Sequence, residues 1–252
     1  MQNVYEQKTI ADLLTIKVVA DEDPQSPREW DNAATLVCWS RRYTLGDEQP
    51  SVDPSEWLEG YKAANPEALI VPIYKYEHSG IALSTGAFSC PWDSGQCGYA
   101  VISADKIAKE WPLSDMHPTP EAQREAARKC IDAEVETYSA YCNGDVYGYI
   151  IEDEDGEQLD ACFGFYGATE EALKAGEEAA AFYLPKAQSA KQEALRVERL
   201  EQAAPAMLAA LERVAGVADT AASILAKIAP EEAARFREDA KTCRAAIEQA
   251  TA

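Results

Sequence analysis

Short apolar runs rich in β-branched and aromatic residues, separated by Gly, Pro and Asp, occupy the first two-thirds of the chain. This pattern is typical of strands joined by turns. Its densest part is residues 72–103, PIYKYEHSGIALSTGAFSCPWDSGQCGYAVIS, which predicts three antiparallel strands. Pro91, Gly95 and Gly98 interrupt the pattern and predict a long loop over residues 88–98. Long loops on rigid sheets often carry function.

Further strands are predicted at residues 15–20 and 34–40, whereas residues 4–14 predict a short helix or an irregular lead-in. The runs 146–151 and 158–166 flank an acidic segment that contains an Asp-Gly pair. Because Asp-Gly favours a tight turn, these two runs predict a β-hairpin.

Helices are predicted at residues 56–64, 105–110 and 121–141. Thr119 is a suitable N-cap for the longest, with Pro120 at its first helical position. Its apolar residues recur at intervals of three and four, so one face should pack on the sheet. These residues are Ala127, Ile131, Val135, Tyr138 and Cys142.

From residue 169 the sequence becomes rich in alanine and charged residues, which indicates helices. Prolines divide it into predicted helices at 169–184, 186–203, 205–228 and 231–250. An apolar heptad register runs through Val197, Leu200, Ala204, Met207, Leu211 and Val214. We therefore expect a helical hairpin that packs on itself or on a second copy, rather than a long continuous coiled coil.

The predicted fold class is α+β: an antiparallel sheet with helices packed on one face, followed by an α-helical C-terminal module. The expected domains are an acidic α+β domain at residues 1–168 and a helical hairpin or small bundle at residues 169–252. The sequence contains no run of 18 apolar residues, so no membrane span is expected, and its N-terminus has no secretory signal pattern. Seven scattered cysteines indicate reduced thiols and a cytoplasmic location.

Acidic residues dominate the predicted first domain. Residues 1–166 hold 30 acidic and 12 basic side chains, whereas residues 167–252 hold 14 and 11. Such a field repels phosphates, so direct nucleic-acid binding is not expected, and it attracts basic protein surfaces. The alternative is that the charge serves solubility only. The adjacent Arg41 and Arg42 are expected to pair internally with the acids of the loop at residues 21–31.

Two chemical interpretations of the 88–98 loop compete with a structural one. Cys90 or Cys97 could act as a nucleophile, with His78 as base and Asp93 as orienting group. A metal site is the second, but Cys90 and Cys97 lack the short spacing of a metal knuckle. Neither a metal nor another cofactor is expected.

The structural interpretation is favoured for the same loop. In it Cys90 and Trp92 pack inward, while Asp93 and Ser94 cap the turn through hydrogen bonds from side chain to backbone. The acidic segment at residues 152–157 lacks the twelve-residue calcium-loop pattern with its terminal glutamate, so it predicts a solvated hairpin tip.

Three segments, Ser26–Asn32 (SPREWDN), Cys90–Gly95 (CPWDSG) and the hairpin at 146–167, resemble an uncharacterised family of acidic proteins from bacteriophages and mobile elements. The resemblance covers about residues 15–167. The helical tail is similar to tails appended to small phage proteins. The resemblance implies an accessory protein in the cytoplasm of an infected bacterium, and it implies no reaction and no catalytic residues.

The expected function is to bind and inhibit or modulate a host nucleic-acid-handling or defence protein, such as a nuclease, by mimicking nucleic acid. The alternatives are a cysteine-dependent enzyme using Cys90, His78 and Asp93, or a non-enzymatic protein-binding module with another role. Self-association through the C-terminal helices is also expected, and membrane binding is not. The expected partner-binding residues are Asp21, Glu22, Asp23, Glu29, Asp31, Glu152, Asp153, Glu154, Asp155 and Glu157.

Overall fold

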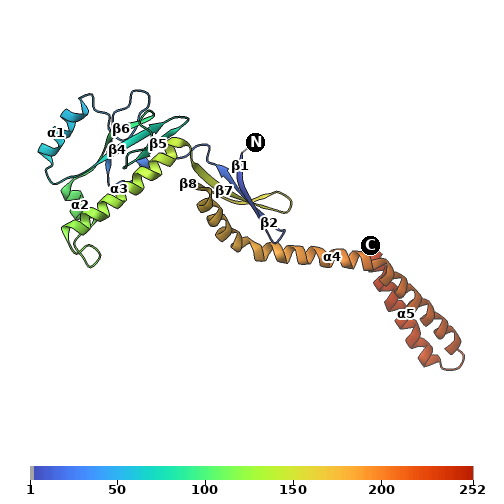
Figure 1. Cartoon of the computed structure of the whole chain (residues 1–252). Coiled ribbons are helices and arrows are strands. Elements are labelled where there is room, and N and C mark those ends of the chain that lie inside the picture. The colour runs from blue at the N-terminus through green and yellow to red at the C-terminus, as the bar shows by residue number, and fades with distance from the viewer. Residues whose placement is uncertain (1–2, 252) are drawn as a thin grey trace. The chain divides into compact units, whose positions relative to one another are not determined.

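The computed structural model describes residues 3–251 and divides the chain into two compact units, one ending at Leu184 and one beginning at Pro185 (Figure 1). The first unit contains all the strands and the second is helical. Every pairing between neighbouring strands is antiparallel. The α+β prediction is therefore confirmed, with two sheets where one was expected.

One four-stranded sheet has the order β3-β6-β4-β5 and contains the predicted 72–103 unit. Its strands are β3 (Thr35–Cys38), β4 (Leu69–Glu77), β5 (Ile81–Ser84) and β6 (Ser94–Ile102). The long helix α3 (Pro120–Asn143) packs on this sheet (Figure 1). Ala127, Ile131 and Val135 of α3 are fully buried with Leu36 and Ile73 of the sheet, as the apolar spacing predicted.

Two shorter helices flank this core, α1 (Pro54–Ala64) and α2 (Ala104–Glu110). Asp53, Ser103 and Thr119 cap α1, α2 and α3, because each side chain accepts a hydrogen bond from a backbone N–H in the first turn. Gly144 ends α3 in the left-handed conformation, with φ of 82°. These local stop and start signals place the helices where they were predicted.

The other sheet has the order β1-β2-β7-β8. Its strands are β1 (Val4–Ile10), β2 (Leu14–Ala20), β7 (Val146–Asp153) and β8 (Gln158–Tyr166). The predicted helix or lead-in at residues 4–14 is wrong, because β1 forms a hairpin with β2. Ala11 and Asp12 make its turn with φ of 53° and 54°, a conformation that usually calls for Gly or Asn. The sequence therefore contains no recognisable turn signal at Ala11 and Asp12.

The start of α4 (Thr169–Leu225) covers the β1-β2-β7-β8 sheet. Ala172 packs with Val18 and Tyr147, and both Ala172 and Ala180 are fully buried. Gly176 lies so close to the sheet that an added Cβ would be 2.8 Å from the Cγ2 atom of Ile16. The division at Leu184 therefore falls later than the expected boundary at residue 168, since these helical turns complete the core of the first unit.

The second unit is a helical hairpin made by the end of α4 and by α5 (Pro230–Thr251). Its interface is built of small residues, because alanines on both helices are buried: Ala215, Ala218, Ala222, Ala233 and Ala240. Pro230 begins α5, but Pro185 and Pro205 lie inside α4, so the predicted breaks there are wrong. An internal proline removes one helical hydrogen bond without having to end the helix.

Much of the predicted heptad register remains uncovered. Val197, Leu200, Met207 and Val214 are between 42% and 59% exposed. None of the helices within residues 3–251 combines the length and apolar character needed to cross a membrane.

The close approach at Gly176 predicts a position-specific effect. Replacing Gly176 by Val should lower the free energy of unfolding of the first unit by about 1–3 kcal/mol, because the side chain would overlap Ile16 and Tyr149. Urea unfolding followed by tryptophan fluorescence measures this unit alone, since all five tryptophans precede residue 112.

Gly60 in α1 is the matched control, since an added Cβ there meets no atom within 4 Å. Gly60→Ala should leave stability unchanged or raise it by up to about 1 kcal/mol. Equal losses in the two variants would contradict the packing of α4 on the sheet.

Candidate functional site

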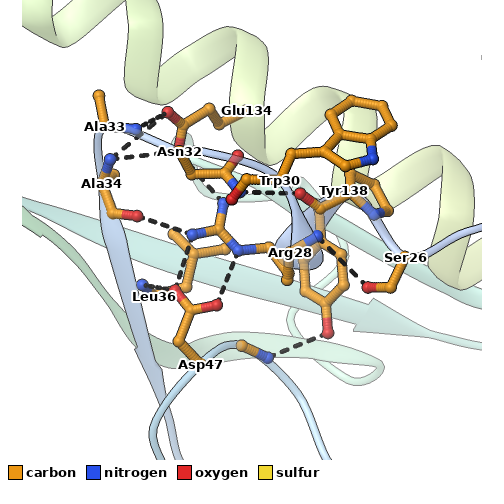
Figure 2. A network of polar contacts seen from close by, with 12 residues as sticks. Ser26, Arg28, Trp30, Asn32, Ala33, Ala34, Leu36, Asp47, Glu134 and Tyr138 are labelled. Carbon is orange, nitrogen blue, oxygen red and sulfur yellow. Dashed lines mark hydrogen bonds and ion pairs between the residues drawn. The ribbon is translucent and has the colours of Figure 1, made fainter.

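Arg28 joins three segments that are far apart in the sequence (Figure 2). It lies in η1 (Pro27–Glu29), a single 3-10 turn that Ser26 caps. Its Nε and Nη2 donate to the two carboxylate oxygens of Asp47 at 2.9 and 2.7 Å, and Nη1 donates to Glu134 at 3.1 Å. Nη2 also donates to the carbonyl oxygen of Ala34 at 2.7 Å. Only 8% of the side chain is exposed.

The two carboxylates that hold Arg28 also hold the backbone around the start of β3. Glu134 Oε1 accepts the N–H of Ala33 at 2.6 Å, and Asp47 Oδ2 accepts the N–H of Leu36 at 2.7 Å. Burial opposes the charged guanidinium, but the hydrogen bonds and charges of Asp47 and Glu134 outweigh it and raise the pKa of Arg28. The core of the SPREWDN segment is therefore a structural connector between η1, β3 and α3.

Cys90, Asp93 and His78 lie close together, as expected for a thiol site, but His78 does not contact Cys90 and so cannot activate it. Cys90 Sγ donates to Asp93 Oδ2 at 3.6 Å, and His78 Nδ1 lies 3.8 Å from the same oxygen. A base must contact the nucleophile, whereas here the carboxylate stands between the thiol and the imidazole. The His78 side chain is also 70% exposed, so water competes with these contacts.

The structural interpretation of this loop is correct only in part. Ser94 Oγ donates to the carbonyl oxygen of Cys90, as a turn cap should. Trp92, however, is 91% exposed, so the prediction that it packs inward is wrong. The predicted loop is also shorter than expected, since β6 already begins at Ser94.

The acidic residues expected to bind a partner form two separate groups. Strands β2 and β7 are paired from Leu14 with Asp153 to Ala20 with Tyr147. The β7–β8 tip thus lies at one end of this ladder, and the 21–31 loop leaves from the other end, roughly 20 Å away at about 3.3 Å per residue. These two groups do not form one continuous surface.

Hydrogen bonds fix the backbone of the β7–β8 tip. Asp153 Oδ1 accepts the N–H groups of Asp155 and Glu157 at 3.0 and 2.9 Å, and Glu152 pairs with Lys17 at 2.5 Å. Glu154, Asp155 and Glu157 are exposed. In the part of the chain that the structure describes, no cluster of His, Cys, Asp and Glu could hold a metal ion.

A cleft of about 540 Å³ opens beside the Cys90–Gly95 loop. The predicted pairing of Arg41 and Arg42 with the 21–31 loop is wrong: these residues follow the other end of β3, and Arg42 pairs with Glu77 of β4 at 2.8 Å. The cleft is lined by Trp39, Ser40, Arg41, Arg42, Lys75, Glu77, Trp92, Asp93, Ser94, Gly95, Gln96 and Cys97. Sequence reasoning missed Trp39 and Lys75, which join this cleft only through the pairing of β3, β4 and β6.

Cys97 occupies a β-bulge in the wall of this cleft. Ile73 is paired with Gly98 and Tyr74 with Gln96, so Cys97 is the extra residue of β6. A hydrogen bond from Cys38 and the charge of Lys75 lower the pKa of Cys97 despite its burial. The pKa of Cys38 is raised by the same hydrogen bond and by burial. The environment of Cys97 therefore favours its thiolate.

No protein-family model matches this chain, and neither a curated protein nor a solved structure shows significant similarity to it. The resemblance to acidic phage proteins stays a prediction, and the function has to be inferred from the chain's own geometry.

Removing Arg28 tests whether its ion pairs with Asp47 and Glu134 stabilise the first unit. Arg28→Ala should lower the free energy of unfolding by about 3 kcal/mol, because it leaves the carboxylates of Asp47 and Glu134 without their buried cation. Lys129→Ala is the control, since its pair with Glu125 is largely exposed and should contribute under about 1 kcal/mol. Similar losses in urea unfolding would contradict the role of Arg28.

Cys97 should react with an alkylating reagent at lower pH than Cys130 and Cys142. Burial raises the pKa of both Cys130 and Cys142 to about 11. Iodoacetamide labelling of Cys97, normalised to its plateau at high pH and measured by peptide mass spectrometry, should therefore rise at lower pH than labelling of these two. A midpoint for Cys97 equal to theirs would show that Cys38 and Lys75 do not stabilise its thiolate.

Proposed function

We propose that this protein binds a basic surface on a nucleic-acid-handling protein and inhibits or modulates it by occupying that surface. The observation that carries the proposal is the β7–β8 tip, where five acidic side chains lie within the six residues 152–157. The side chain of Asp153 holds the turn, so the exposed carboxylates of Glu154, Asp155 and Glu157 stand on an ordered hairpin. Preorganised groups lose little entropy when they bind.

The distribution of charge supports the same proposal. Residues 1–166 hold 30 acidic and 12 basic side chains, whereas the rest of the chain is nearly balanced. A field of one sign steers a partner of the opposite sign and raises its association rate. Because the 21–31 loop lies at the other end of the sheet, its acids contribute to this field, and the tip makes the proposed contact.

The proposed partner is a nuclease or another defence protein of a host bacterium, whose basic surface normally holds nucleic acid. This identity of the partner rests on the resemblance to acidic phage proteins. A cysteine-dependent reaction through Cys90 is less favoured, since Asp93 separates the thiol from His78.

Charge reversal at the tip tests the contact. The triple variant Glu154→Lys, Asp155→Lys and Glu157→Lys spares the turn-forming Asp153 and the Lys17 partner Glu152. In pull-downs from bacterial lysate, the wild-type protein should retain basic proteins that added duplex DNA displaces, and the variant should lose them. Retention should also fall as salt rises from about 0.01 to 0.15 M, where the screening length drops from about 30 to 8 Å.

The control carries the same change in charge on exposed helical positions, Glu178→Lys, Glu201→Lys and Glu212→Lys, and should keep its partners. Equal loss from both variants would mean that only net charge matters. Partners that resist both salt and the tip variant, or tight binding of this protein to a random DNA duplex, would contradict the proposal.

A further inference from the structure

The cleft beside Trp92 concentrates positive charge in a domain that is otherwise strongly acidic. Of the 12 basic side chains in residues 1–166, Arg41, Arg42 and Lys75 line this one cleft. Glu77 is shared by two of them, at 2.8 Å from Arg42 and 2.6 Å from Lys75. Arg41 is exposed and has no ion pair within residues 3–251. Two carboxylates also line the cleft, Glu77 between two of the cations and Asp93 beside Cys90. Three cations against two carboxylates leave an excess of positive charge, with Arg41 outside any ion pair of the described residues, so the mouth of the cleft suits an anion.

Trp92 offers a flat apolar surface beside these cations. Its side chain is 91% exposed, which leaves a large aromatic surface in water. The loop that carries it is tied to the sheet, because the N–H of Glu77 donates to the carbonyl oxygen of Asp93 at 2.9 Å and Ser94 bonds back to Cys90. An indole held next to positive charge is the arrangement that stacks an aromatic ring while cations bind an attached phosphate.

Contacts within the protein hold other side chains of the lining in place. The indole N–H of Trp39 donates to the carbonyl oxygen of Val52 at 2.9 Å, and the ring packs edge-on against Trp57 at 5.6 Å. Arg42 and Lys75 each lie 5.7 Å from the centre of the Tyr43 ring, so their positions are restricted as well. A concave volume of about 540 Å³ lies within the range of small-molecule sites, roughly 300–1,000 Å³.

We propose that this cleft binds a nucleoside monophosphate, with the phosphate between Arg41, Arg42 and Lys75 and the base stacked on Trp92. The site is independent of the acidic tip, and neither proposal requires the other. Cys97 in the wall would be covered by the ligand, so its labelling reports occupancy.

The full-length protein is titrated with AMP, GMP, CMP and UMP at low salt, and binding is measured by calorimetry and tryptophan fluorescence. At least one nucleotide should saturate the protein, quench its fluorescence and slow the labelling of Cys97. Adenosine, which lacks the phosphate, and inorganic phosphate, which lacks the base, should each bind more than about tenfold more weakly. Failure of all four nucleotides to saturate at millimolar concentration would overturn the proposal.

Two variants separate the two halves of the site. Arg41→Ala and Trp92→Ala should each weaken nucleotide binding about tenfold or more, since stacking and charge-assisted contacts both contribute at this level. Both side chains are exposed, so thermal unfolding should match the wild type. Trp30→Ala is the control: this half-exposed tryptophan packs on Tyr166, outside the cleft, and its loss should leave affinity unchanged. Nucleotide binding that survives both Arg41→Ala and Trp92→Ala would place the ligand elsewhere and overturn the proposal.

Discussion

The fork of hydrogen bonds around Arg28 is the constraint on which the first unit depends. One buried guanidinium satisfies the carboxylates of Asp47 and Glu134, and these in turn hold the backbone N–H groups at the start of β3. A planar group with five donors can join three segments in this way, whereas a lysine would supply a single point of contact. Through these bonds the entrance of the chain into β3 is fixed against α3.

That attachment of β3 also positions the cleft. Strand β3 lies beside β6 from Thr35 to Cys38, and the chain then passes directly into Trp39, Arg41 and Arg42. Gly98 of β6 has no side chain where one would meet the backbone of Val37 and the sulfur of Cys38, so the two strands approach closely. Core packing on one face of the sheet therefore sets the geometry of an exposed site at its end.

Charge divides the first unit into regions of different chemistry. The β7–β8 tip presents carboxylates on a fixed turn, and the cleft gathers three cations with two carboxylates, Glu77 and Asp93. Lys75 donates a hydrogen bond to Glu77, and this bond together with the charges of Lys75 and Arg42 lowers the pKa of Glu77, so that glutamate is ionised at neutral pH. An acidic protein can thus hold a local anion site, because short contacts within a cleft outweigh a distant field that salt screens.

Strong local signals were enough to predict several features: the caps of α1, α2 and α3, the apolar face of α3, the β7–β8 hairpin and the α+β class. The sequence could not determine β1, whose turn at Ala11 and Asp12 lacks glycine, or the length of α4, which continues through Pro185 and Pro205. The partners of Arg28, the order of Cys90, Asp93 and His78, and the placement of Lys75 with Trp39 in one cleft became visible only in the folded chain. These contacts depend on strand pairing and register between distant segments, and local periodicity carries no information about which strands pair.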